Sequence, residues 1–117
     1  MSRKVLAAVT DLFFVAKVEP LARRAGAEIA FCSTTEELLA QAKAGADLVL
    51  LDLNDRALDA LELIEKLRAH PETASLPTMA FFSHVQTELG RKAQEAGCHQ
   101  VIPRSQLAAR LVDFLRG

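Results

Sequence analysis

Short apolar runs alternate with longer stretches of helical periodicity along the whole sequence, and this alternation narrows the choice of fold more than any other feature. The clearest run, Asp47 to Leu53 (DLVLLDL), is apolar on both faces, as a central strand of a parallel sheet must be. We expect strands at Lys4 to Val9, Ala27 to Cys32, Asp47 to Leu53, Thr78 to Phe82 and His99 to Ile102. We expect helices at Leu12 to Ala25, Glu36 to Ala44, Leu58 to Ala69, Thr87 to Ala96 and Ser105 to Arg116.

Five strands that alternate with five helices predict an α/β fold with a parallel sheet. Because crossovers between parallel strands are right-handed, the helices should cover both faces and form a doubly wound three-layer sandwich. Gly26, Gly45 and Gly97 each separate a helix from the next strand, where glycine can adopt the left-handed conformation. Pro20 should either kink the first helix or split it into two segments.

Length and composition exclude several classes of protein. The 117 residues suffice for one core, so we expect a single domain over residues 1–117 with no output domain. A net charge of -1 lacks the positive field of nucleic-acid-binding proteins. No apolar run approaches the ~20 residues that span a bilayer, and the N-terminus is unlike a signal peptide, so we expect a cytoplasmic protein. Cys32 and Cys98 fit buried small apolar side chains better than a disulfide or a metal site.

Polar side chains follow four of the predicted strands, at the carboxyl ends where open parallel sheets bind ligands. Two carboxylates and a backbone carbonyl at this edge would suit a hard divalent cation such as Mg²⁺. A carboxylate can also attack phosphorus, with a hydroxyl and a cation stabilising the phosphoryl oxygens. The residues that follow the strands are Thr10, Asp11, Asp52, Asn54, Ser83, His84, Arg104 and Ser105.

Simpler structural roles are open for the same residues. Asp11 would serve as the N-cap of the first helix, which is compatible with metal binding. Asp52 could cap the third helix or pair with Arg104. Ser83 and His84 are adjacent at a strand end, where neighbouring side chains diverge, so a Ser-His-Asp triad is not expected. The glycines form neither a GxGxxG motif nor a P-loop. Because the strand ends offer neither a nucleophile–base pair nor a phosphate-binding loop, we expect no enzyme in the ordinary sense.

Three stretches resemble the receiver domains of response regulators. They are DLVLLDLN (Asp47 to Asn54), DALEL (Asp59 to Leu63) and GCHQVIPRS (Gly97 to Ser105). The resemblance covers nearly the whole chain. It implies a CheY-like, flavodoxin-like (βα)5 fold with sheet order 2-1-3-4-5.

The resemblance also assigns roles to individual residues. It implies that Asp52 is the phosphoacceptor and that Ser83 is the switch hydroxyl. It implies Mg²⁺ binding by the carboxylates of Asp11 and Asp52 and by the main-chain carbonyl of Asn54. Arg104 takes the position of the lysine that contacts the phosphoryl group.

Several positions depart from the receiver pattern. One acidic residue, Asp11, follows the first strand where the family has two, so Mg²⁺ binding should be weaker. An arginine at position 104 pairs with carboxylates in a different geometry from a lysine. His84 stands beside the switch hydroxyl, where it would crowd the entrance to Asp52. The other departures are Val101 for an aromatic residue, Ser105 for a proline, and Arg56 and Ala60 for the Pro and Gly of the loop after the phosphoacceptor.

These residues leave two functions open. The first is a stand-alone receiver that takes a phosphoryl group from a histidine kinase or a phosphotransfer protein onto Asp52 with Mg²⁺, and that acts by binding a downstream protein. The second is a pseudo-receiver, an interaction module without phosphorylation, in which Arg104 locks Asp52 in an ion pair. The resemblance also implies that residues 87–96, 99–102 and 105–116 form the face for self-association as a homodimer.

Overall fold

The computed structural model describes residues 3–83 and 86–116. His84, which we expected to crowd the entrance to Asp52, lies outside the described residues. The strands are β1 (Lys4–Ala8), β2 (Glu28–Phe31), β3 (Leu48–Asp52), β4 (Thr78–Phe82) and β5 (Gln100–Pro103). The helices are α1 (Leu12–Arg24), α2 (Thr35–Ala44), α3 (Ala60–Ala69), α4 (Thr87–Glu95) and α5 (Leu107–Arg116), with a 3₁₀ turn, η1 (Arg104–Gln106), before α5.

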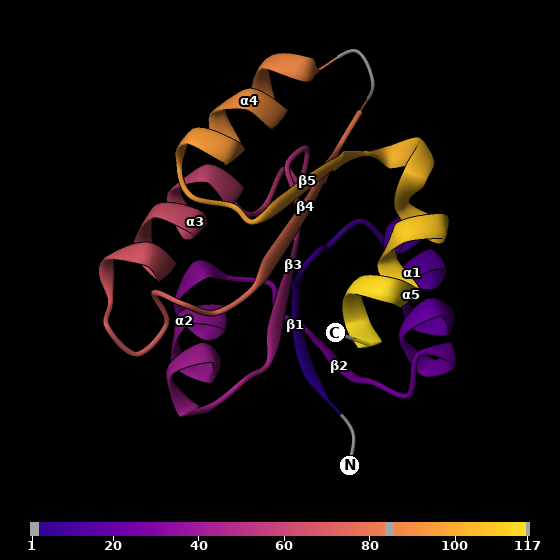
Figure 1. The fold of residues 1–117 in the computed structure, drawn as a ribbon, viewed down its shortest axis with the longest axis horizontal. Helices are drawn as coiled ribbons and strands as arrows, with labels where there is room; N and C mark the ends of the chain where they lie inside the picture. Colours follow the sequence, from indigo (N-terminus) through magenta and orange to yellow (C-terminus); the bar gives the residue numbers. More distant parts are fainter. Residues whose placement is uncertain (1–2, 84–85, 117) are drawn as a thin grey trace.

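The strands form one parallel sheet in the order β2-β1-β3-β4-β5. Figure 1 shows α1 and α5 on one face of this sheet and α2, α3 and α4 on the other. The predicted doubly wound three-layer sandwich with order 2-1-3-4-5 is therefore confirmed. β2 pairs with one edge of β1, and β3 pairs with its other edge, so the order of the strands reverses at β1. This switch point is where such sheets place their ligands, at the carboxyl ends of the strands.

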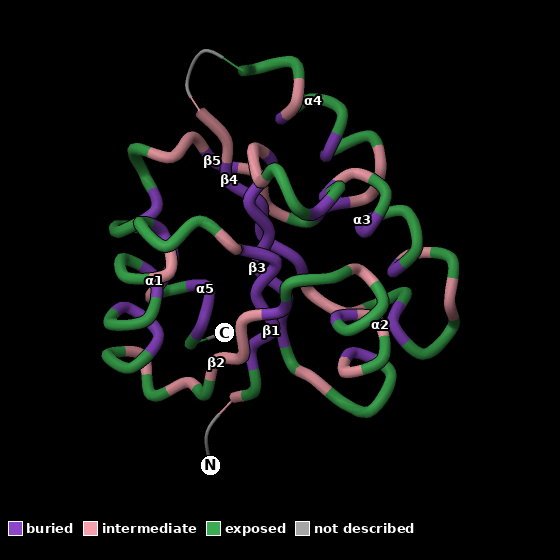
Figure 2. Tube along the Cα trace, turned by 180° about the vertical axis from the view of Figure 1, so that it is seen from behind, coloured by how far each residue is buried: buried purple, intermediate pink, exposed green. Residues whose placement is uncertain are grey.

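Side chains of the inner strands alternate between two cores, one on each face of the sheet. On β3, Leu48 and Leu50 belong to the core under α1 and α5, whereas Val49 and Leu51 belong to the core under the other three helices. Figure 2 shows this burial along the central strands. Burial on both faces explains why the first four residues of β3 are all apolar. Continued alternation directs the next residue, Asp52, toward α1 and α5.

Capping side chains and a short turn set the helix boundaries that differ from the prediction. α3 begins at Ala60, two residues later than expected, because Asp59 caps it by accepting a hydrogen bond from the N–H of Glu62 at 3.1 Å. The last helix was expected from Ser105, but the chain first makes the 3₁₀ turn η1, and α5 begins at Leu107. This turn places Arg104 between the end of β5 and the start of α5.

Pro20 lies within α1, which runs unbroken from Leu12 to Arg24, so the proline does not split the helix. Pro20 has no N–H to donate to the carbonyl of Ala16 one turn earlier. Both residues are exposed, so water can hydrogen-bond that carbonyl instead.

The chain turns after α1 and α4 as the glycine pattern predicts. Gly26 and Gly97 have φ of +73° and +107°, conformations that residues with a Cβ rarely adopt. Cys32 and Cys98 are free and buried, as expected. Within residues 3–83 and 86–116, no helix combines the length and the apolar character needed to cross a membrane.

Candidate functional site

Asp52 is the last residue of β3 and lies at the switch point of the sheet. It pairs in register with Phe81 of β4, and its side chain faces α1 and α5. The residue is 2 % exposed, one of few buried polar residues in the described part of the chain. Its Oδ1 accepts a hydrogen bond from the backbone N–H of Asn54 at 2.9 Å, which turns the chain sharply after the strand.

A hollow of about 220 Å³ opens over the Asp52 carboxylate at the carboxyl ends of β1 and β3. It brings together four of the residues that we predicted for the site: Asp11, Asp52, Asn54 and Arg104. The full lining, among the described residues, is Thr10, Asp11, Phe14, Asp52, Asn54, Asp55, Arg56 and Arg104.

Ser83, the fifth predicted residue, follows β4 but is not among the described residues that line this hollow. Its backbone N–H donates a hydrogen bond to Oδ1 of Asn54 at 2.8 Å. The loop after β3 is therefore fastened to the end of β4. This contact keeps Ser83 next to the loop that carries the predicted Mg²⁺-binding carbonyl.

Asp11 caps α1, the simpler of the two roles considered for it. Its Oδ1 accepts a hydrogen bond from the N–H of Phe13 at 2.9 Å, and the residue is exposed. A carboxylate can cap a helix through one oxygen and still offer the other to a cation. Its role as a metal ligand stays a prediction.

The surroundings of Asp52 raise the pKa of its carboxyl group. Burial raises the pKa of the Asp52 carboxyl above its ordinary value, and the nearby carboxylates of Asp55 and Asp11 add to the rise. The hydrogen bond from Asn54 and the charge of Arg104 oppose it. A cation in the hollow would relieve the repulsion among the carboxylates and favour the ionised form.

The ion pair that we expected between Arg104 and Asp52 is absent from the described residues, where no N···O contact of 4.0 Å or less joins the two. The guanidinium carbon of Arg104 instead lies 4.4 Å from the centroid of the Phe14 ring. A guanidinium stacks well on an aromatic face, and this contact holds it on α1 rather than on the carboxylate. The Arg104 lock is therefore wrong for this structure, although its charge still acts on Asp52.

Asp55 lines the hollow although the sequence did not predict it as a site residue. It accepts hydrogen bonds from the backbone N–H of Thr10 at 2.6 Å and from the Thr10 hydroxyl at 2.8 and 2.9 Å. It also accepts from the N–H groups of Ala57 and Leu58 at 2.9 and 3.1 Å. We call this arrangement the Thr10–Asp55 clasp. It ties the loop after β1 to the loop after β3 across the edge of the hollow.

The donor set of the hollow suits a hard cation. Carboxylate oxygens of Asp11 and Asp52 and the main-chain carbonyl of Asn54 are the kinds of ligand that Mg²⁺ prefers, and no sulfur or imidazole lines the hollow among the described residues. Within the same described part, no three acidic, His or Cys side chains converge as a ready ligand cluster. Mg²⁺ commonly keeps several waters and few protein ligands, so these residues fit the ion without such a cluster.

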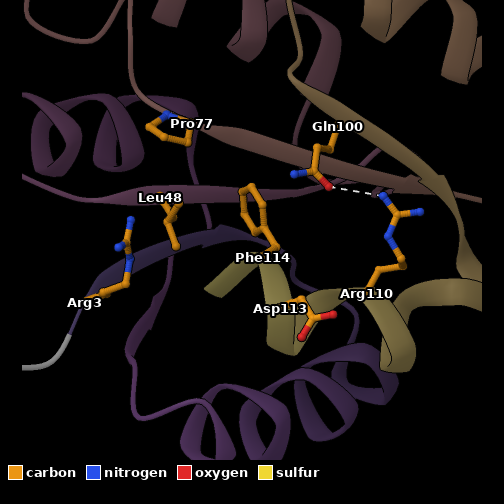
Figure 3. A pocket seen from close by; sticks show the side chains of 7 residues that line it. All are labelled: Arg3, Leu48, Pro77, Gln100, Arg110, Asp113 and Phe114. Carbon is orange, nitrogen blue, oxygen red and sulfur yellow. Dashed lines mark hydrogen bonds between the residues drawn. The ribbon is translucent and has the colours of Figure 1, made fainter. Parts of the chain in front are cut away.

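A larger hollow, of about 490 Å³, lies at the opposite end of the sheet and contains none of the predicted site residues. Figure 3 shows Phe114 of α5 in its centre, with Arg110 beside Gln100. The distance from Nη2 of Arg110 to Oε1 of Gln100 is 3.4 Å. Its lining residues are Arg3, Leu48, Pro77, Gln100, Arg110, Asp113 and Phe114, and they pair no nucleophile with a base.

Comparison with known proteins gives a clear result for structure and none for sequence. No protein-family model and no curated protein matches the sequence. The receiver domain of the sensor histidine kinase PA1611 from Pseudomonas aeruginosa, solved with a magnesium ion in its active-site cleft, matches with a TM-score of 0.85 at 16 % identity, over 99 % of this chain and 96 % of that chain.

Two further solved structures also match this chain over nearly its whole length. The chemotaxis response regulator CheY4 of Vibrio cholerae matches with a TM-score of 0.81 at 17 % identity, over 98 % of this chain and 99 % of that one. The receiver domain of NtrX from Brucella abortus matches with a TM-score of 0.82 at 20 % identity, over 96 % of this chain and 97 % of that one. Together with the sheet order and the layers described above, these matches show that the chain has the fold of response-regulator receiver domains.

Proposed function

We propose that this chain is a receiver-like signalling module in which Asp52 accepts a phosphoryl group. The observation that carries the proposal is the position of Asp52. It is buried at the carboxyl end of the central strand, at the base of a hollow that also holds Asp11, Asn54 and Arg104. Receiver-fold neighbours that match over nearly their full length, one of them with magnesium in its cleft, support this proposal.

In the proposed reaction, an Asp52 carboxylate oxygen forms a bond to phosphorus while the bond from phosphorus to the donor breaks. The electron pair of the broken bond leaves with the donor, the imidazole of a phosphohistidine or the acetate of acetyl phosphate. The product is an aspartyl phosphate; the imidazole leaving group takes up a proton from water, whereas acetate leaves as the anion. The donor in the cell would be a histidine kinase or a phosphotransfer protein.

The residues around Asp52 have distinct roles in this proposal. Asp11, Asp52 and the main-chain carbonyl of Asn54 would hold Mg²⁺, which when bound neutralises the phosphoryl oxygens. Arg104 supplies positive charge beside the phosphoryl group. Ser83 would donate its hydroxyl to a phosphoryl oxygen after a movement toward Asp52. This movement would alter the face formed by α4, β5 and α5, through which the module would bind a downstream protein or a second copy of itself.

The alternative, a pseudo-receiver that binds partners without phosphorylation, rests on the departures from the receiver pattern. Burial raises the pKa of the Asp52 carboxyl, so its ionised, nucleophilic form costs more free energy than that of an exposed carboxyl. The Arg104 contact on Phe14 speaks against the locked version of this alternative, since the carboxylate is not held by that guanidinium.

Incubation with acetyl phosphate and Mg²⁺, followed by intact-mass measurement, tests the proposal. We expect the unmodified chain to gain about 80 Da, the mass of one phosphoryl group. Asp52→Asn should gain nothing, and Asp59→Asn, which removes an exposed carboxylate at the start of α3, should be modified like the unmodified chain. No mass gain in the unmodified chain, with conditions that stabilise an acyl phosphate, would leave the pseudo-receiver as the better description.

A further inference from the structure

The Thr10–Asp55 clasp lies at the edge of the candidate phosphoacceptor hollow, and nothing in the predicted site assigns it a role. Asp55 is half-buried and makes hydrogen bonds with residues of two separate loops. The Thr10 side chain points at this carboxylate through its hydroxyl, at 2.8 and 2.9 Å from the two oxygens. Thr10 carries no charge of its own, and its hydroxyl instead binds the negatively charged carboxylate of Asp55.

We propose that Asp55 is a positioning residue for a divalent cation at this site. Asp11 is the one acidic residue after β1, where the receiver pattern has two. Asp55, from the loop after β3, would supply the negative charge that Thr10 lacks. This inference rests on the proposed function, because it concerns the cation that would accompany phosphorylation of Asp52. It adds a residue and a loop contact that the receiver resemblance did not assign.

The charge balance of the hollow depends on Asp55. Three carboxylates, those of Asp11, Asp52 and Asp55, line it together with the guanidinium groups of Arg56 and Arg104. With all three carboxylates ionised the lining is net negative, and without the charge of Asp55 the two remaining carboxylates and the two guanidinium groups cancel. Arg104 lies on the Phe14 ring and pairs with none of these carboxylates within 4.0 Å, although its charge still acts on Asp52.

The clasp also fixes the geometry of the loop that carries the predicted carbonyl ligand. Asp55 follows Asn54 directly, and its backbone N–H donates to the carbonyl of Asp52 at 3.1 Å. Anchoring the Asp55 side chain to Thr10 therefore restrains the neighbouring residue Asn54, which lines the hollow. A cation would meet a loop that is already ordered, which lowers the entropy that binding must overcome.

The test measures cation binding directly, through loss of the EPR signal of free Mn²⁺ and its recovery with excess Mg²⁺. Asp55→Asn removes the charge and keeps one acceptor oxygen for the N–H groups of Ala57 and Leu58 and the Thr10 hydroxyl, while its NH2 group replaces the oxygen that accepts from the Thr10 N–H. We expect it to weaken Mn²⁺ binding by about tenfold, since one unit charge a few ångströms from a divalent ion is lost. Asp59→Asn is the matched control. It removes a carboxylate from the same segment but outside the hollow, keeps a good helix cap, and should change binding by less than about twofold.

The double variant Thr10→Asp/Asp55→Asn moves the charge back to position 10 and reverses the clasp, since the amide introduced at position 55 can donate to the carboxylate introduced at position 10. We expect it to bind Mn²⁺ within about threefold of the unmodified chain. A thermal melt followed by circular dichroism shows whether Asp55→Asn is folded. If it is not, Mn²⁺ binding by the double variant tests the inference instead.

Three results would overturn the inference: Mn²⁺ binding by Asp55→Asn that matches the unmodified chain, equal losses in Asp55→Asn and Asp59→Asn, or a double variant far weaker than the unmodified chain. Its failure is distinguishable from failure of the proposed function. The Mn²⁺ series measures binding without phosphorylation, whereas the acetyl phosphate experiment measures covalent modification of Asp52.

Discussion

Replacement of Asp52 by asparagine should stabilise the folded chain at neutral pH while it removes the proposed phosphoacceptor. The Asp52 side chain is 2 % exposed and lies near the carboxylates of Asp55 and Asp11. Asparagine has the same size and retains the oxygen that accepts from the N–H of Asn54 at 2.9 Å. The substitution therefore removes the charge and little else.

The size of the effect follows from the small number of groups that stabilise the charge. Within the described residues, the Asp52 carboxylate accepts one hydrogen bond and makes no ion pair. A buried, incompletely stabilised polar group typically costs about 1–3 kcal/mol, and we expect Asp52→Asn to raise the free energy of unfolding by about 2 kcal/mol at pH 7. For a urea m-value of about 1–3 kcal/mol/M, the midpoint should move upward by roughly 1 M.

The gain should depend on pH, with a sign that the raised pKa of Asp52 determines. The folded chain binds this proton more readily than the unfolded chain, so unmodified protein loses stability as the pH rises from the ordinary carboxyl range through the raised pKa. Below both pKa values Asp52 is neutral in both states, and the variant should have no advantage. The difference should open as the pH rises and then reach a plateau.

Urea unfolding followed by circular dichroism, at several pH values between about 4 and 8, measures this difference. Asp59→Asn is the control, because it removes an exposed carboxylate of the same segment and retains the helix cap. An Asp52→Asn chain that is less stable than the unmodified chain at pH 7 would refute the reasoning. So would a gain that stays constant over the whole pH range.

Two further predictions concern other parts of the fold. Gly97→Ala should destabilise more than Gly26→Ala in thermal melts. A Cβ at Gly97 would lie 2.9 Å from Cγ of Arg68, whereas one at Gly26 meets nothing within 4 Å, and both positions have positive φ. We expect about 1 kcal/mol for Gly26→Ala and roughly 2–3 kcal/mol for Gly97→Ala, and equal losses would contradict the argument. Burial, followed by the nearby Glu37 carboxylate, raises the pKa of Cys32 to about 11, so iodoacetamide should label this thiol only after unfolding. Rapid labelling of Cys32 in the native chain, mapped by peptide mass, would show that the thiol is accessible.

The fold could be predicted because its main determinants are local. Burial of the central strand on both faces produces an unbroken apolar run, and each helix that packs on one face of the sheet carries a matching apolar stripe. Both patterns are visible within a window of a few residues. The boundaries that differed depend on finer local geometry, such as the cap by Asp59 and the 3₁₀ turn at Arg104.

The composition of the site was predictable only in part. Asp11, Asp52, Asn54 and Arg104 meet in one hollow because strand ends of a parallel sheet lie at one edge. The ion pair between Asp52 and Arg104 was wrong because it depended on side-chain directions that strand order does not fix. The ring of Phe14, in the first turn of α1, offers the guanidinium a second place to lie.

The role of Asp55 was harder to predict from the sequence, because its partner Thr10 is 45 residues away. Taken singly, Thr10 is a position where the receiver pattern has an acidic residue and this chain does not. Asp55, taken singly, is an ordinary loop residue. In the structure they form one hydrogen-bonded pair, so the change at position 10 and the carboxylate at position 55 have to be judged together. The same holds for Arg104 and Phe14, whose contact alters what an arginine can do at that position. A departure from a family pattern at one position thus does not settle the chemistry of a site, because a neighbour in space can supply or withdraw the charge. This is why the Mn²⁺ series moves the charge from position 55 to position 10 as well as deleting it at position 55.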